Sequence, residues 1–185
     1  AEGTDPVLKK SYSGKARLRQ HMHDFANEVL RILTGEAGAF GSRITFARRK
    51  GPGRKDVYVA SFDGHRFGRV SSGDGVAMLP AFGPGGIWYS KMTPRGMFVT
   101  RTGTGERPII EGDGLNMAPA ACGGRILFVS DRHNGGQRCG NVAVSGNMYT
   151  MEPDGSDLYR ISWHETNERC PTIDSGGKIV YSRWD

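Results

Sequence analysis

The segment His164-Glu165-Thr166-Asn167-Glu168 carries the residue types best suited to chemistry in this sequence. Imidazole and carboxylate groups can transfer protons or hold a metal ion. The segment follows a predicted strand and should therefore form a loop, without the fixed one-face spacing that a helix gives to such ligands. We expect His164, Glu165, Asn167 and Glu168 to contact a partner molecule. The alternative is a polar loop whose hydrogen bonds are all made within the protein.

A second polar segment, residues 132–146, reads as an insertion between two predicted strands. It contains His133 and Arg138, which we also expect to contact a partner. It also contains Cys139, which with Cys122 and Cys170 makes the three cysteines of the chain. One disulfide among them is compatible with an oxidising compartment, but their spacing does not choose the pair and matches no compact metal motif.

The usual catalytic signatures are missing from the sequence. It has no Gly-x-Ser-x-Gly elbow, no phosphate-binding loop and no His-Glu-x-x-His pair. Asp154-Gly155-Ser156-Asp157 is similar to part of a calcium loop but lacks its bidentate glutamate, so a hairpin turn explains it better. We therefore predict no catalytic residue, no metal site and no cofactor.

The elements that position these residues are strands of a repeat with a period of about forty residues. Each unit places a Pro-x-x triplet, at Pro80, Pro119 and Pro171, before a Gly-rich turn and a β-branched or aromatic run. The runs are 42–48, 86–91, 123–132 and 176–183, the second strands are 56–60, 96–100 and 147–151, and the last strands are 67–70, 108–111 and 158–162. Four short antiparallel strands per unit predict a mainly β fold made of β-propeller blades.

The repeats amount to about three blades, whereas closed propellers use four to eight. We therefore expect that the chain is a piece of a longer protein, or that further copies or a second chain complete the ring. Open end blades would otherwise expose strand edges.

The first residues do not follow the repeat. Pro6–Tyr12 alternates enough for a short strand, and apolar residues at intervals of three and four predict an amphipathic helix over Lys15–Leu33, with Gly35 as its C-terminal cap. We assign residues 1–38 to the end of a small α/β domain with its linker, and residues 39–185 to a partial propeller.

The net charge of +6 has no strong local focus. The one basic cluster, Arg48–Lys55, lies between two predicted strands, where a solvated hairpin loop is the simplest structure. The sequence therefore favours neither a nucleic-acid partner nor, having no apolar run long enough to span a bilayer, membrane insertion.

Two stretches resemble a known family. Residues Arg17–Val29 and Leu33–Phe46, with a helix ending in Leu-Thr-Gly and then Gly-x-Phe before a strand, resemble the junction between the α/β domain and the propeller of TolB-type periplasmic proteins. The resemblance implies a six-bladed propeller, a periplasmic or secreted location, and protein binding in the Tol–Pal cell-envelope system. A Pal-like lipoprotein is the implied partner.

The sequence departs from that family by lacking most of the α/β domain and by its insertion at 132–146. Its last third, including Ser130-Asp131-Arg132 and Ile179–Asp185, is similar to secreted propellers such as that of the hydrazine synthase α subunit. The repeat pattern, the missing catalytic signatures and the TolB-like junction together favour a non-enzymatic scaffold for protein–protein interaction. The alternative is the propeller portion of a secreted enzyme that depends on a metal or cofactor.

Overall fold

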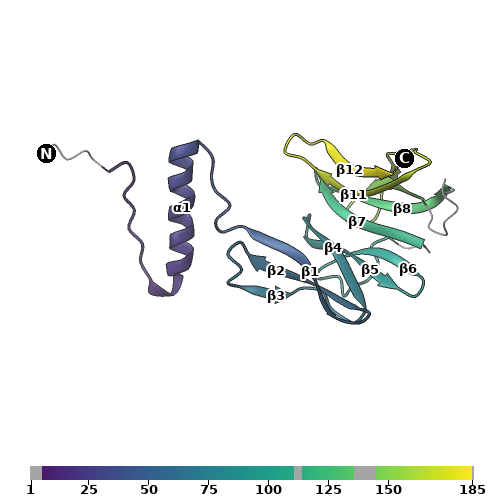
Figure 1. The fold of residues 1–185 in the computed structure, drawn as a ribbon, viewed down its shortest axis with the longest axis horizontal. Helices are drawn as coiled ribbons and strands as arrows, with labels where there is room; N and C mark the ends of the chain where they lie inside the picture. Colours follow the sequence, from purple (N-terminus) through teal and green to yellow (C-terminus); the bar gives the residue numbers. More distant parts are fainter. Residues whose placement is uncertain (1–5, 111–113, 136–144, 185) are drawn as a thin grey trace. The chain divides into compact units, whose positions relative to one another are not determined.

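The computed structural model describes residues 6–110, 114–135 and 145–184. Two compact units can be distinguished in the chain: unit 1 comprises Ala1–Ile44 and Ala60–Phe67, and unit 2 comprises Thr45–Val59 and Gly68–Asp185. Figure 1 shows one helix near the N-terminus and strands in the rest of the chain. The fold is mainly β, as the sequence predicts.

The helix of unit 1 is α1, Leu18–Thr34, preceded by a 3-10 turn at Lys15–Arg17. Gly35 follows it with a φ of 82° and donates its N–H to the carbonyl of Arg31, which confirms the predicted cap. The predicted strand at Pro6–Tyr12 is wrong, because these residues are not paired with a neighbouring strand in the described part of the chain.

The strands fall into groups that follow the repeat, here called blades 1 to 4 (Figure 1). Blade 1 holds β1 (Arg43–Gly51), β2 (Arg54–Ser61) and β3 (Phe67–Arg69); blade 2 holds β4 (Val76–Gly83), β5 (Gly86–Thr93) and β6 (Gly96–Arg101); blade 3 holds β7 (Gly114–Cys122), β8 (Arg125–Gly135), β9 (Ser145–Met151) and β10 (Tyr159–Arg160); blade 4 holds β11 (Asn167–Ile173) and β12 (Ile179–Trp184). The pairs β4–β5, β5–β6, β7–β8, β8–β9, β9–β10 and β11–β12 are antiparallel. Short parallel contacts, β2 with β4 and β6 with β7, link successive blades.

The last strand of blade 2, predicted at Pro108–Glu111, is wrong as far as the structure describes it, since residues 108–110 are not assigned to a strand and Glu111 lies outside the described residues. Pro108 has no N–H to donate to a ladder, and only Ile109 donates to β6, through the carbonyl of Val99 at 3.0 Å. One such bond does not make a strand.

The repeated Pro-x-x triplet marks a repeated bulge. The residue before each proline has a positive φ: 53° at Leu79, 54° at Ala118 and 50° at Cys170. The pairing register shifts at the same point in β4, β7 and β11. Positive φ is uncommon for residues with a side chain, so the bulge is a shared feature of the three strands. β7 contacts both β4 and β11, which places these first strands of their blades next to one another.

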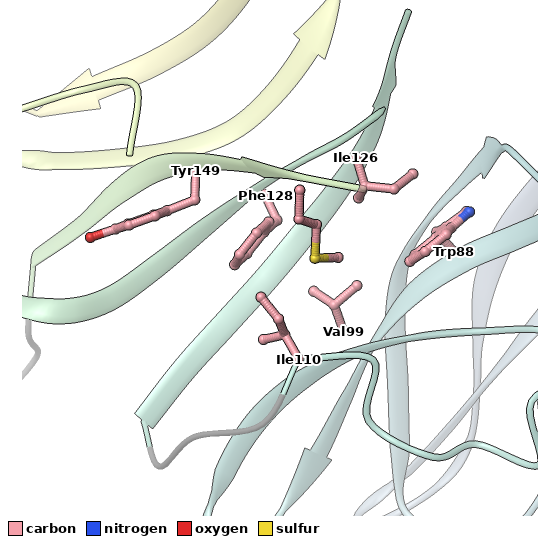
Figure 2. Packing of buried hydrophobic residues seen from close by; sticks show 7 residues of the cluster. Trp88, Val99, Ile110, Ile126, Phe128 and Tyr149 are labelled. Atoms are coloured by element: carbon pink, nitrogen blue, oxygen red, sulfur yellow. The ribbon is translucent and has the colours of Figure 1, made fainter. Parts of the chain in front are cut away.

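The cores lie between blades. Figure 2 shows the cluster between blades 2 and 3, where side chains of the two blades face one another. Its members are Trp88, Val99, Ile110, Ile126, Phe128, Tyr149 and Met151. Leu127 and Met148 alternate with these residues and pack instead toward Ile173, Ile179 and Tyr181 of blade 4. Blade 3 therefore buries an apolar face on each side, as a blade inside a propeller must.

Candidate functional site

The predicted loop lies between β10 and β11 and enters the first strand of blade 4 at Asn167. Asn167 is buried, and its side-chain oxygen accepts the N–H of Gly146 at 3.1 Å. A Cβ on Gly146 would lie 2.5 Å from the Cγ1 of Val129, so only glycine fits this close approach. Asn167 thus ties the start of blade 4 to the beginning of β9 in blade 3.

Glu168 is fully buried. Its Oε2 accepts hydrogen bonds from the Ser162 hydroxyl and, at 3.2 Å, from the N–H of Met148. Its Oε1 has no hydrogen-bond partner among the described residues, and the Nε2 of His164 lies 3.7 Å away. A buried carboxylate oxygen without a hydrogen-bond donor lowers the stability of the fold. Oε1 of Glu168 is such an oxygen, and the group nearest to it across the loop is the imidazole of His164.

His164 is held from three sides although its side chain is 44% exposed. Its carbonyl accepts the side-chain N–H of Asn147 at 2.8 Å, and its Nδ1 lies 3.3 Å from a guanidinium nitrogen of Arg183. Arginine can only donate, so Nδ1 is the acceptor in this contact, and Nε2 faces Glu168. The ring is an exposed polar group with a fixed orientation.

Trp163, next to His164, is 70% exposed. The guanidinium of Arg160 lies over its ring, 5.9 Å from the centroid, and is itself fixed by the carbonyl of Ser162 at 2.6 Å and by Asn147 at 2.8 Å. The reasoning from sequence passed over Trp163 and Arg160. The sequence signal that could have revealed them is a tryptophan directly before the polar segment, since tryptophan is common at binding surfaces.

An open pocket of about 540 Å³ lies beside these residues in unit 2. Its lining combines the loop with apolar side chains of blades 3 and 4: Met148, Ile161, Ser162, Trp163, His164, Ile179 and Tyr181. Apolar walls with a few convergent polar groups are typical of binding pockets.

The other predicted contact residues are less concentrated. Glu165 is exposed on the same loop. His133, exposed at the end of β8, places its Nδ1 2.6 Å from the hydroxyl of Tyr149, whose pKa is raised by burial. Within the described residues, no hydrogen bond or ring contact joins His133 to the loop at 163–168. Arg138 lies outside the described residues.

The described cysteines are not paired with one another. Cys122 and Cys170 are free thiols, and Cys139 lies outside the described residues. In the part of the chain that the structure describes, no three His, Cys, Asp or Glu residues gather as metal ligands would. Asp154 accepts the N–H of Ser156 at 2.9 Å, which confirms the hairpin turn predicted there.

A second hydrogen-bonded glutamate, the partly buried Glu106, was not predicted. It lies after the turn that follows β6 and accepts hydrogen bonds from Lys91 Nζ at 2.7 Å, the Tyr89 hydroxyl at 2.9 Å and the Ser72 N–H at 2.6 Å. The contact joins residues 15 to 34 positions apart, and no local pattern signals it. Burial, and then the bond to Glu106, raise the pKa of Tyr89.

Comparison with known proteins connects this architecture to one family. The chain is 30% identical over 130 residues to the Tol-Pal system protein TolB of Desulfosudis oleivorans, covering 67% of this chain and 29% of that protein. It is 25% identical over 177 residues to a protein TolB homolog of Chlorobium chlorochromatii, covering 93% of this chain and 38% of that protein. No protein-family model matches the chain.

The solved structures agree on the fold. The crystal structure of TolB from Acinetobacter baumannii superposes with a TM-score of 0.65 at 23% identity, covering 94% of this chain and 46% of the other. The chain thus spans about a third of the two curated relatives and about half of this structure. In the described residues, no helix combines the length and apolar character needed to cross a membrane.

Proposed function

We propose that this TolB-like propeller chain works by binding a partner protein of the Tol–Pal cell-envelope system, without turnover of a substrate. The Desulfosudis oleivorans relative, matched over 67% of this chain, carries the name of that system, and the Chlorobium chlorochromatii relative carries the name TolB homolog. A Pal-like lipoprotein is the partner we propose, and the periplasm is the location.

The observation that carries the proposal is the rigid exposed pair Trp163 and His164 at the rim of the pocket. Binding energy at protein interfaces concentrates in a few aromatic and arginine side chains whose conformations are fixed before binding. Here Arg160 stacks on the tryptophan, while Asn147 and Glu168 hold the loop from beneath. In this proposal Asn167 and Glu168 position the surface and Glu165 lies on it, whereas His133, bonded to Tyr149, is a separate contact.

The enzymatic alternative stays a prediction. Its ligands would have to include Cys139 or other residues outside the described part of the chain, since the described residues form no such group.

The test is a calorimetric titration of the chain with the soluble domain of the Pal protein from the same organism. We expect Trp163→Ala and His164→Ala each to weaken binding, by about 2 kcal/mol, or roughly 30-fold, for the tryptophan. Both side chains are exposed, so the unfolding transition should stay within about 0.5 kcal/mol of the unmodified chain.

The matched control is His65→Ala, which removes an exposed histidine from unit 1. Its affinity should equal that of the unmodified chain. Unchanged affinity in the Trp163→Ala variant would refute this site, and a partner that fails to bind the unmodified chain would refute the choice of partner.

A further inference from the structure

A second pocket, of about 410 Å³, lies within unit 1, between the start of α1 and the turn that follows β2. Its lining is basic and polar: Arg17, Arg19, Gln20, His23, Ser61 and Arg66. None of the residues that line it is acidic. A concave site lined by three arginines concentrates positive charge, and like charges repel unless an anion is present.

Two carboxylates next to the lining neutralise part of this charge. Asp63 pairs with Arg19 and, at 3.2 Å, with the Nε2 of His23. Asp24 accepts the side-chain N–H of Gln20 at 2.8 Å. Neither contacts Arg17 or Arg66, and these two arginines have no acidic partner among the described residues.

The start of α1 increases the imbalance. Helix N-termini carry partial positive charge and normally hold an acidic side chain or a capping oxygen. α1 has neither, since its first turn contains no acidic residue and Arg17, at the cap position, makes no side-chain cap bond. Cations therefore occupy the end of the helix where an anion is stabilised.

We infer that this pocket binds an oxyanion, with Arg17 and Arg66 as its principal ligands. A guanidinium group donates two parallel hydrogen bonds to the oxygens of a phosphate or a carboxylate. Either kind of oxyanion could therefore be bound by these arginines. Arg19 adds charge but is shared with Asp63. The pocket belongs to unit 1 and involves none of the residues proposed to bind the partner protein, so either proposal can fail alone.

The experiment is a calorimetric titration with sodium phosphate at pH 7, with the ionic strength held constant by sodium chloride. We expect saturable binding with one site per chain. The double variant Arg17→Gln, Arg66→Gln should lower the association constant at least tenfold while its circular dichroism spectrum stays unchanged.

The control double variant, Arg95→Gln with Arg107→Gln, removes the same charge from exposed arginines of unit 2. It should bind phosphate as the unmodified chain does. An equal loss in both double variants would mean general attraction to a basic protein and would overturn the site, as would phosphate binding that does not saturate.

Citrate then distinguishes the two sources of the oxyanion. Displacement of phosphate by citrate would show that carboxylates also bind, and phosphate retained against citrate would restrict the site to phosphoryl groups. Either outcome requires the saturable phosphate binding that the inference predicts.

Discussion

Two glutamates hold loops of this propeller, Glu106 with a side chain 12% exposed and Glu168 fully buried, and their carboxylate oxygens are hydrogen-bonded to different degrees. Both oxygens of Glu106 are occupied, by Lys91, the Tyr89 hydroxyl and a backbone N–H. Only one oxygen of Glu168 is occupied, and the other faces His164 at 3.7 Å without a hydrogen bond. The second network includes Ser162, the neighbour in sequence of the exposed Trp163.

The difference predicts different responses of the two networks to mutation. A fully satisfied buried network adds rigidity and leaves nothing to offer a ligand. A partly satisfied one carries the cost of an unpaired buried oxygen, and such groups are found at functional sites. The comparison therefore predicts that removing Glu106 damages folding more than removing Glu168, whereas removing Glu168 disturbs binding more.

The largest effect is expected for Glu106→Ala. It leaves the Lys91 ammonium, whose side chain is only 9% exposed, without a counter-charge, and breaking a buried ion pair in this way costs about 3–5 kcal/mol. The free energy of unfolding in urea measures it. Glu152→Ala removes an exposed glutamate paired with Arg125 and should cost less than about 1 kcal/mol. Equal losses in the two variants would contradict the role assigned to the buried pair.

A smaller loss of stability is expected for Glu168→Ala, about 1–3 kcal/mol, because it removes the acceptor of the buried Ser162 hydroxyl and leaves no buried cation unpaired. The N–H of Met148 keeps the Ser162 hydroxyl oxygen as an acceptor at 2.8 Å. The same urea titration gives the value. Glu165→Ala, three residues earlier and exposed, should stay within about 0.5 kcal/mol of the unmodified chain. A loss for Glu168→Ala equal to that for Glu106→Ala would show that the two networks do not differ in this way.

The repeat made much of the fold predictable. Alternation and Gly-rich turns located the strands β5, β6, β8 and β9, because each has both a local turn signal and a two-residue period. The strand predicted at Pro108 failed because pairing depends on a neighbour, which local pattern does not supply. The sequence shows the repeated Pro-x-x triplet, but it does not show that the residue before each proline has a positive φ and forms a bulge.

The candidate site was predictable in residue type and not in role. The predicted loop is right for residues 164–166 only, because Asn167 and Glu168 begin β11. These two residues are buried and bond to residues about 20 positions away. Long-range contacts of this kind determine which polar residues remain exposed. Trp163 is exposed for the same reason, since only three-dimensional packing shows that no core residue covers it.

The smallest effect at neutral pH, and the most specific, is expected for Tyr89→Phe. It removes one hydrogen bond to Glu106, worth about 1 kcal/mol, and leaves the Lys91 pair intact. Burial and the bond to Glu106 raise the pKa of Tyr89, so the folded state keeps a proton that the unfolded state releases above about pH 10. The stabilisation is fully present below that pH and is lost as the pH rises beyond it.

Urea titrations between pH 8 and 11 would show this as a fall in unfolding free energy for the unmodified chain. The fall should be shallower for Tyr89→Phe, and not absent, because the pKa of Tyr149 is also raised by burial. Tyr159→Phe, at a residue that is 58% exposed, should leave the fall unchanged. If Tyr89→Phe also leaves it unchanged, the tyrosine does not report on the Glu106 network, and the contrast between the two glutamates rests on Lys91 alone.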